Sequence, residues 1–162
     1  MLVDNYKDLI LPNDFKTYID EHLYEFNKDE TIHLANKCYE LGVKTKDASI
    51  KEAHLKNALR VLYHLQEMYE IMPPDLFFKI NEELISLYIN KNDEKEVKNT
   101  YKIVRDYYRF FDDDYKKVCA YGFSCVAFKY MEYLYSIKDY KGCLFPFDEN
   151  FDGLIKTLKM NQ

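Results

Sequence analysis

The chain has 162 residues, and its 23 lysines and arginines against 28 aspartates and glutamates give a net charge of −5. This acidic balance argues against nucleic acid as a partner, because phosphate binding relies on a basic surface. Four glycines and four prolines are too few for the frequent tight turns of a β-sandwich or barrel, so we expect one all-α domain over residues 1–162.

Six to seven helices, arranged as antiparallel hairpins, are expected in chain order. The sequence places a glycine, Gly42, at the end of the second helix, a capping-box pair, Ser49 and Glu52, at the start of the third, and Pro73–Pro74 at its end. The tail 142–162 forms a short helix at best. The first expected helix is capped by Asn13. The others are expected at Asp29 to Gly42, Ser49 to about Met72, about Asp75 to Asn90, Asp93 to about Phe111, and Asp112 to roughly Lys138.

The last of these helices is apolar around its whole circumference. Between residues 118 and 135 the non-aromatic side chains that readily hydrogen-bond are Ser124, Lys129 and Glu132. A helix of this kind is expected to be the central, most buried one. It is not expected to span a membrane, because charges near its middle would be costly there. The predicted core residues are Val118, Tyr121, Cys125, Phe128 and Leu134.

Residues 78–109 have the pattern of a helix–turn–helix unit. Apolar side chains recur at helical spacing on both sides of a polar break at 90–93, which is how two amphipathic helices face each other. The residues that carry the pattern are Leu84, Tyr88, Val97, Tyr101 and Val104. The unit resembles a tetratricopeptide repeat, and the resemblance implies a helical surface that binds proteins or peptides.

The resemblance covers about a fifth of the chain. Asn81 stands where the family usually has an aromatic residue, Ile85 where it has a small one, and Arg109 where it has proline. A shift by the family period of about 34 residues places the loops inside the helices expected at 50–72 and 114–138. An irregular helical repeat and an ordinary helical bundle therefore both remain open.

Two surfaces of this unit are candidate binding sites. The second helix carries six cations at spacings of 4, 3, 4, 3 and 4, which we call the basic ridge: Lys91, Lys95, Lys98, Lys102, Arg105 and Arg109. Such a ridge fits an acidic protein or another polyanion, although a solvated helix face would have the same pattern. The first helix offers a second surface: Lys79, Glu82, Ser86 and Ile89.

The sequence contains no convincing metal, cofactor or catalytic motif. Asp148 to Gly153 match the first half of a calcium loop, but Lys159 stands where the bidentate glutamate is required, so no metal is expected. The four histidines lack a zinc-binding spacing, and so do the cysteines. Two of the histidines, His54 and His64, are expected at the edges of a helix face. The beginning of the chain lacks the features of a signal peptide, and unpaired cysteines suit a reducing cytoplasm.

We therefore expect a cytoplasmic, non-enzymatic protein-interaction module without a cofactor, acting as a regulator, adaptor or inhibitor. Its partner would be a protein or peptide, with neither nucleic acid nor membrane involved, and a homodimer is possible. One alternative is an immunity protein or antitoxin that neutralises a basic toxin or nuclease, which the net charge of −4 in residues 1–52 (eleven acidic, seven basic) would suit. Another is an enzyme with a dispersed active site, whose signature would be a deep pocket with perturbed carboxylates or histidines.

Overall fold

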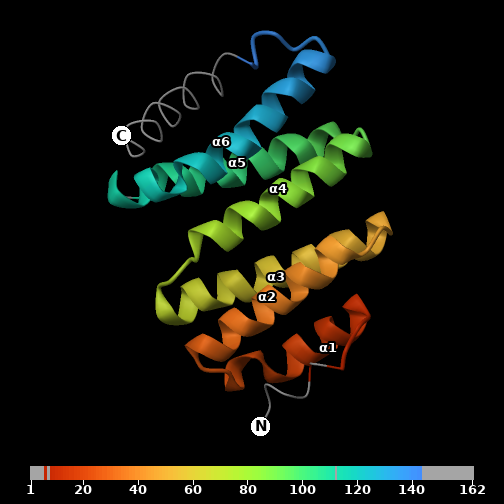
Figure 1. The fold of residues 1–162 in the computed structure, drawn as a ribbon, viewed down its shortest axis with the longest axis vertical. Coiled ribbons are helices and arrows are strands. Elements are labelled where there is room, and N and C mark those ends of the chain that lie inside the picture. Colours follow the sequence, from red (N-terminus) through yellow and green to blue (C-terminus); the bar gives the residue numbers. More distant parts are fainter. Residues whose placement is uncertain (1–5, 7, 112, 144–162) are drawn as a thin grey trace. The chain divides into compact units, whose positions relative to one another are not determined.

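The computed structural model describes residues 6, 8–111 and 113–143, apart from the side chains of Tyr115 and Val118. Every regular element in this part of the chain is helical (Figure 1), which confirms the all-α prediction. The elements are α1 (Pro12–His22), the 3-10 helix η2 (Leu23–Glu25), α2 (Lys28–Lys44), α3 (Ala48–Tyr69), α4 (Pro74–Asn90), α5 (Glu94–Phe110) and α6 (Asp113–Ser136).

The chain forms two compact units, Met1–Ile80 and Asn81–Gln162. The boundary lies within α4, so one helix belongs partly to each unit. The expectation of a single domain over 1–162 stays a prediction.

In the first unit, α2 and α3 pack along each other and α1 lies against α3. Gly42 is buried near the end of α2, where an added Cβ would lie 3.1 Å from Leu55 Cδ2 of α3. The prediction that Gly42 ends the helix is wrong, since α2 continues to Lys44. The glycine instead allows the two helices to approach closely. The largest fully buried side chains of this unit include Phe15, Ile19, Leu34, Leu55, Leu62 and Leu65.

Two predicted helix starts are also corrected. Leu11 precedes α1 without a side-chain cap and Pro12 occupies its first turn, a position that suits proline because its missing N–H would be unpaired there. Asp47 caps α3 by accepting a hydrogen bond from Ile50 N at 3.0 Å. The expected caps, Asn13 and Ser49, therefore lie inside the helices.

The end of α3 also differs from its prediction. The helix stops at Tyr69 because Glu70 adopts the left-handed conformation, with φ 55°. The following prolines do not terminate α3. Pro74 instead begins α4.

Helices α2 and α4 correspond under a shift of 46 residues. Both contain 17 residues, and their first residues (28 and 74) and last residues (44 and 90) are separated by the same step. Asp47 and Asp93, which cap α3 and α5, are again 46 apart, and each accepts a hydrogen bond from the backbone N–H three residues on. Asp139, 46 positions further, accepts one from Gly142 N at 3.0 Å.

The buried faces follow the same shift. The five residues that α2 buries are Thr31, Leu34, Ala35, Cys38 and Gly42. Their counterparts in α4 are all buried: Phe77, Ile80, Asn81, Leu84 and Tyr88. In α6 the counterparts are Phe123, Val126, Ala127, Tyr130 and Leu134, of which Tyr130 alone is half-buried. We call this relation of helices, caps and buried faces the 46-residue correspondence.

In the second unit, α5 packs against α6 through aromatic rings. Tyr108 stacks on Phe123 with ring centroids 4.2 Å apart, and Tyr101 stacks on Tyr130 at 4.1 Å. Phe123 is fully buried and also lies near Tyr101, with ring centroids 6.4 Å apart.

The prediction that α6 is buried on all sides is wrong. Tyr121 is 71% exposed and Phe128 42% exposed, while Cys125 is half-buried. Leu134 is buried as predicted, and the side chain of Val118 is outside the described residues. Burial requires a neighbouring element, and the part of α6 opposite its packed face keeps its apolar side chains in solvent.

Candidate protein-binding surfaces

A groove of about 350 Å³ lies between the second half of α4 and α6. Helical spacing brings its lining residues onto one side of each helix, since positions three and four apart share a face. Hydroxyl, amide and charged groups surround a single aliphatic side chain, so the groove offers both hydrogen-bonding partners and an apolar contact. It is lined by Ser86, Ile89, Asn90, Lys129, Glu132, Tyr133 and Ser136.

Lys129 connects the two helices at this groove. Its Nζ donates to Ser86 Oγ at 2.6 Å and lies 3.3 Å from Glu82 Oε1. Ser86 Oγ in turn donates to the carbonyl of Glu82 at 2.9 Å. The Lys129 and Glu82 side chains are 39% and 34% exposed, so the pair adds little stability but holds the ammonium group in a defined position.

At the far end of the groove, Tyr133 OH donates to Asn92 Oδ1 at 3.3 Å. Asn92 has φ 53°, and the next amide, of Asp93, donates to the carbonyl of Tyr88 at 2.9 Å. This is the hydrogen-bond pattern of a left-handed helix end. The turn after α4 is thereby tied to α6.

The structure brings together part of the predicted first-helix surface. Ser86 and Ile89 line the groove and Glu82 holds Lys129, whereas Lys79 is exposed on the same helix and does not line the groove. The α6 residues of the groove were not among the predicted binding residues. In the sequence, Lys129 and Glu132 are exceptions in an apolar run, and no local pattern indicates which helix faces α4.

The basic ridge lies on α5. Lys91, Lys95, Lys98, Lys102 and Arg109 are exposed, and Arg105 is half-buried. Lys98 Nζ lies 2.8 Å from Glu94 Oε1, and the hydrogen bond to Glu94 raises the pKa of Lys98. Arg105 lies 3.3 Å from Asp106. Pairing four residues apart, as between Lys98 and Glu94, is common on solvated helices, so the ridge stays a predicted binding surface.

A second pocket, of about 450 Å³, lies between α1 and α3 in the first unit. Arg60 and Asp20 form an ion pair across it. His64 lines the pocket in edge contact with Tyr24, at a centroid distance of 5.0 Å, and burial lowers the pKa of His64. The enzyme alternative stays a prediction. The pocket is lined by Ile19, Asp20, Leu23, Tyr24, Lys56, Leu59, Arg60, Tyr63, His64 and Glu67.

Two histidines that were expected at the edges of helix faces are buried. His54 is 2% exposed and His64 8%. His54 packs edge-on against Phe15, with ring centroids 5.9 Å apart. Both act as part of the core, because a neutral imidazole packs well against aromatic rings.

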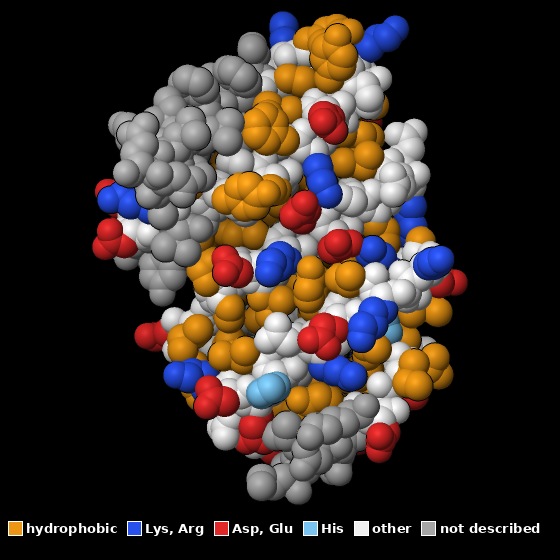
Figure 2. All heavy atoms as spheres, in the orientation of Figure 1, with side chains coloured by type: hydrophobic (Ala, Val, Ile, Leu, Met, Phe, Trp, Pro, Cys, Tyr) orange, Lys and Arg blue, Asp and Glu red, His pale blue; other side chains and the backbone are white. Residues whose placement is uncertain are grey.

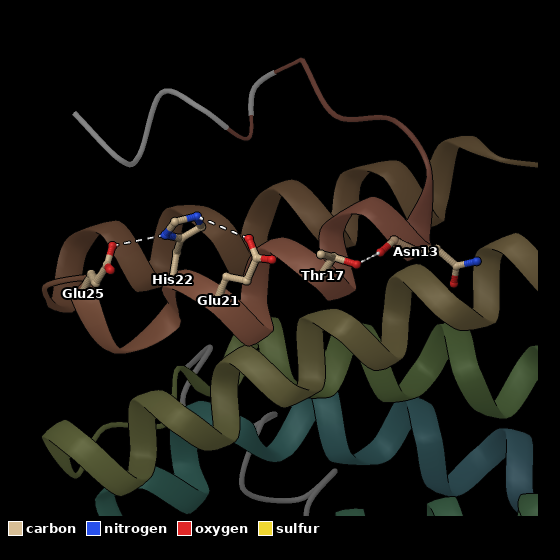
Figure 3. A network of polar contacts seen from close by, with 5 residues as sticks. All are labelled: Asn13, Thr17, Glu21, His22 and Glu25. Atoms are coloured by element: carbon tan, nitrogen blue, oxygen red, sulfur yellow. Dashed lines mark hydrogen bonds and ion pairs between the residues drawn. The ribbon is translucent and has the colours of Figure 1, made fainter.

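Another histidine, His22, lies on the surface of α1 between two carboxylates (Figure 3). Its Nδ1 is 3.2 Å from Glu25 Oε2 and its Nε2 is 3.7 Å from Glu21 Oε2. On the same helix, Thr17 Oγ1 donates to the carbonyl of Asn13. Across the described residues, no group of three histidine, cysteine or acidic side chains could hold a metal ion. The calcium-like loop, 148–159, lies outside the described residues.

The cysteines are unpaired, and burial raises the pKa of the Cys38 thiol to about 12. Among the helices that the structure describes, none has the length and apolar content needed to cross a bilayer.

No family model, curated protein or solved structure matches the chain.

Proposed function

We propose that the chain is a protein-interaction module of the helical-repeat type, and that the groove between α4 and α6 binds a segment of a partner protein. The observation that carries this proposal is that the groove lies between helices related by the 46-residue correspondence. Stacked helical hairpins commonly use the exposed faces of equivalent helices as an extended binding surface. The period of 46 residues differs from the 34 residues of a tetratricopeptide repeat. The proposed likeness to that family is therefore one of helical architecture and not of repeat length.

The chemistry of the groove suits a peptide. Ser86 and Ser136 offer hydroxyl groups, Lys129 a held cation and Glu132 an exposed carboxylate. Such groups can pair with a peptide backbone or polar side chains, while Ile89 offers an apolar contact. Recognition by a few placed polar groups beside an apolar surface is typical of ligand grooves.

The basic ridge can contribute at longer range. Exposed charges act mainly on the rate of encounter and on its salt dependence. An acidic partner surface would therefore be steered toward α5, while contacts in the groove would determine how long the complex lasts.

The test uses two matched substitutions at corresponding positions. Ile89→Arg adds a bulky cation to the groove, and Val43→Arg makes the same change 46 residues earlier, at an exposed position of α2. Tagged proteins are used to capture partners from the native cell, and mass spectrometry measures the amounts. We expect Ile89→Arg to lose the specific partner and Val43→Arg to retain it. Retention by both variants would exclude the groove, and the identity of the partner would separate an adaptor from a toxin-neutralising inhibitor.

A further inference from the structure

Five residues, three of them aromatic, form a line along the exposed side of α6. Its residues are spaced 4, 3, 4 and 3 apart, and we call them the aromatic stripe: Tyr121, Cys125, Phe128, Glu132 and Tyr135. Tyr121 is 71% exposed, Phe128 42% and Tyr135 68%. Hydrophobic side chains are visible over this region of α6 in Figure 2. Single exposed apolar residues need no explanation, but three exposed rings on one side of a helix, separated only by Cys125 and Glu132, indicate an interaction site.

The 46-residue correspondence provides an internal reference for this stripe. The same positions in α4 are Asp75, Lys79, Glu82, Ser86 and Ile89, and those in α2 are Asp29, His33, Asn36, Glu40 and Val43. All of these residues are exposed or half-buried, and most are polar. The fold therefore accepts polar side chains at these positions, and the aromatic residues of α6 require another explanation.

Carboxylates accompany the aromatic rings. Glu132 is an exposed member of the stripe and makes no hydrogen bond or ion pair with another described residue. Glu82 of α4 lies near Cys125 of the stripe. Burial raises the pKa of the Cys125 thiol, and the negative charge of Glu82 raises it further. The nearby cation, Lys129, is already paired with Glu82. A surface of aromatic faces and an exposed carboxylate attracts arginine or lysine, through cation–π contacts and ion pairing.

The size of the stripe favours a short segment over a second copy of the chain. Aromatic side chains have areas of about 150–250 Å², so the exposed parts of the three rings amount to roughly 350 Å². A stable dimer usually buries about 800 Å² on each partner. The fifteen residues of helix from Tyr121 to Tyr135 span about 21 Å. These dimensions fit a helix of similar length lying along α6.

We propose that the aromatic stripe docks a basic amphipathic helix of a partner protein, with apolar residues on Tyr121, Phe128 and Tyr135 and an arginine or lysine at Glu132. Recognition of one amphipathic helix by another helical surface is an established binding mode. The proposal rests on the proposed interaction function and defines the chemistry of the partner.

Synthetic peptides serve as the probe. One is a helix of leucine, arginine and alanine with its leucines on a single face. A second has the same composition with the leucines distributed around the helix, and a third has glutamate in place of arginine. Fluorescence anisotropy measures their binding to the full chain. We expect only the first peptide to bind well, and equal binding of the second or third would overturn the proposal.

Substitutions in the stripe locate the site. Tyr121→Asp and Tyr135→Ile introduce the residues found at the corresponding positions of α4, and together they should weaken binding at least about tenfold. Tyr24→Ile is the control. It removes a tyrosine of η2 that is 80% exposed but lies outside the stripe, and it should leave binding unchanged. Glu132→Gln should weaken binding and reduce its salt dependence. Unchanged binding in the stripe variants would refute the proposal.

Two further outcomes separate this proposal from others. Sedimentation that shows a dimer abolished by Tyr121→Asp would assign the stripe to a second copy and overturn the proposal. If the Tyr121→Asp and Tyr135→Ile variant still captures the native partner while Ile89→Arg does not, the stripe proposal fails and the groove function stands. Loss of the partner in the stripe variant and in Ile89→Arg supports the stripe proposal and the groove function together.

Discussion

Gly42→Ala tests how closely α2 and α3 approach each other. Gly42 is buried inside α2, and a Cβ at this position would meet Leu55 Cδ2 and Cγ at 3.1 Å and His54 Cβ at 3.3 Å. Leu55 is fully buried, so it has little room to move away. Two opposing effects decide the outcome.

Alanine in a helix interior is more favourable than glycine by about 0.8–1 kcal/mol. An extra methyl group in a well-packed core typically costs about 1–3 kcal/mol. Because the contacting atoms belong to a buried residue on α3, we expect the steric cost to exceed the helix propensity. The net loss should be about 1 kcal/mol, which lowers the melting temperature by about 2–4 °C for a chain of this size.

Urea and thermal unfolding measure the effect, and a second background isolates its cause. Leu55→Ala should cost about 2–5 kcal/mol by itself, but it removes the two Leu55 atoms that the new methyl group would meet at 3.1 Å and leaves the looser contact with His54 Cβ at 3.3 Å. In that background Gly42→Ala should therefore stabilise the protein by up to about 1 kcal/mol. A stabilising effect of Gly42→Ala in the unmodified chain would show that the helices are not tightly packed here. The same sign in both backgrounds would refute the reasoning.

Three further predictions concern the second unit, the ridge and the buried imidazole. Phe123→Ala should cost about 3–5 kcal/mol in urea unfolding because Phe123 is fully buried, while Phe128→Ala should cost much less because that ring is 42% exposed. Reversing Lys98 and Lys102 to Glu should change the unfolding free energy by less than about 1 kcal/mol but slow association with an acidic partner and weaken its salt dependence. Burial lowers the pKa of His54 from 6.5, so stability should be fully present above pH 6.5 and decline as the pH falls below it, because the unfolded chain binds the proton first. His54→Gln should flatten this decline in thermal unfolding.

Each of these three predictions would be contradicted by a specific result. Equal losses for Phe123→Ala and Phe128→Ala would mean that α6 is buried on both sides. An unchanged association rate and salt response would assign Lys98 and Lys102 to solvation. A pH profile that is the same with and without His54 would place the acid sensitivity elsewhere.

Several helix boundaries were predictable because the signals that define them are local. The helix expected to begin at Asp93 is α5, which Asp93 caps, and the limits of α4 agree within one residue. The capping-box pattern of Ser49 and Glu52 predicts the wrong cap for α3, because Asp47 caps the helix with a single hydrogen bond from Ile50 N and needs no such pattern. Gly42 was misread because glycine serves both helix ends and close helix contacts, and only the position of Leu55 separates the two.

The exposed side of α6 could not be predicted from residue pattern. Tyr121 and Phe128 have the same apolar character as buried Phe123, and hydrophobic periodicity identifies a face only when the other faces are polar. Which side is buried depends on where α4 and α5 pack. Those contacts join residues 15 to 43 positions apart, from Tyr108–Phe123 to Ser86–Lys129, so no local pattern encodes them.

The sequence by itself determined the all-α class, most helix limits and the exposed cations of the ridge, because turns, caps and charge spacing act over a few residues. Tertiary structure alone decided that Glu82, Ser86 and Ile89 share a groove with Lys129 and Glu132. It also revealed the 46-residue correspondence. Thr31, Phe77 and Phe123 occupy corresponding buried positions despite their different chemistry, because burial at a helix face is set by the packing of distant elements.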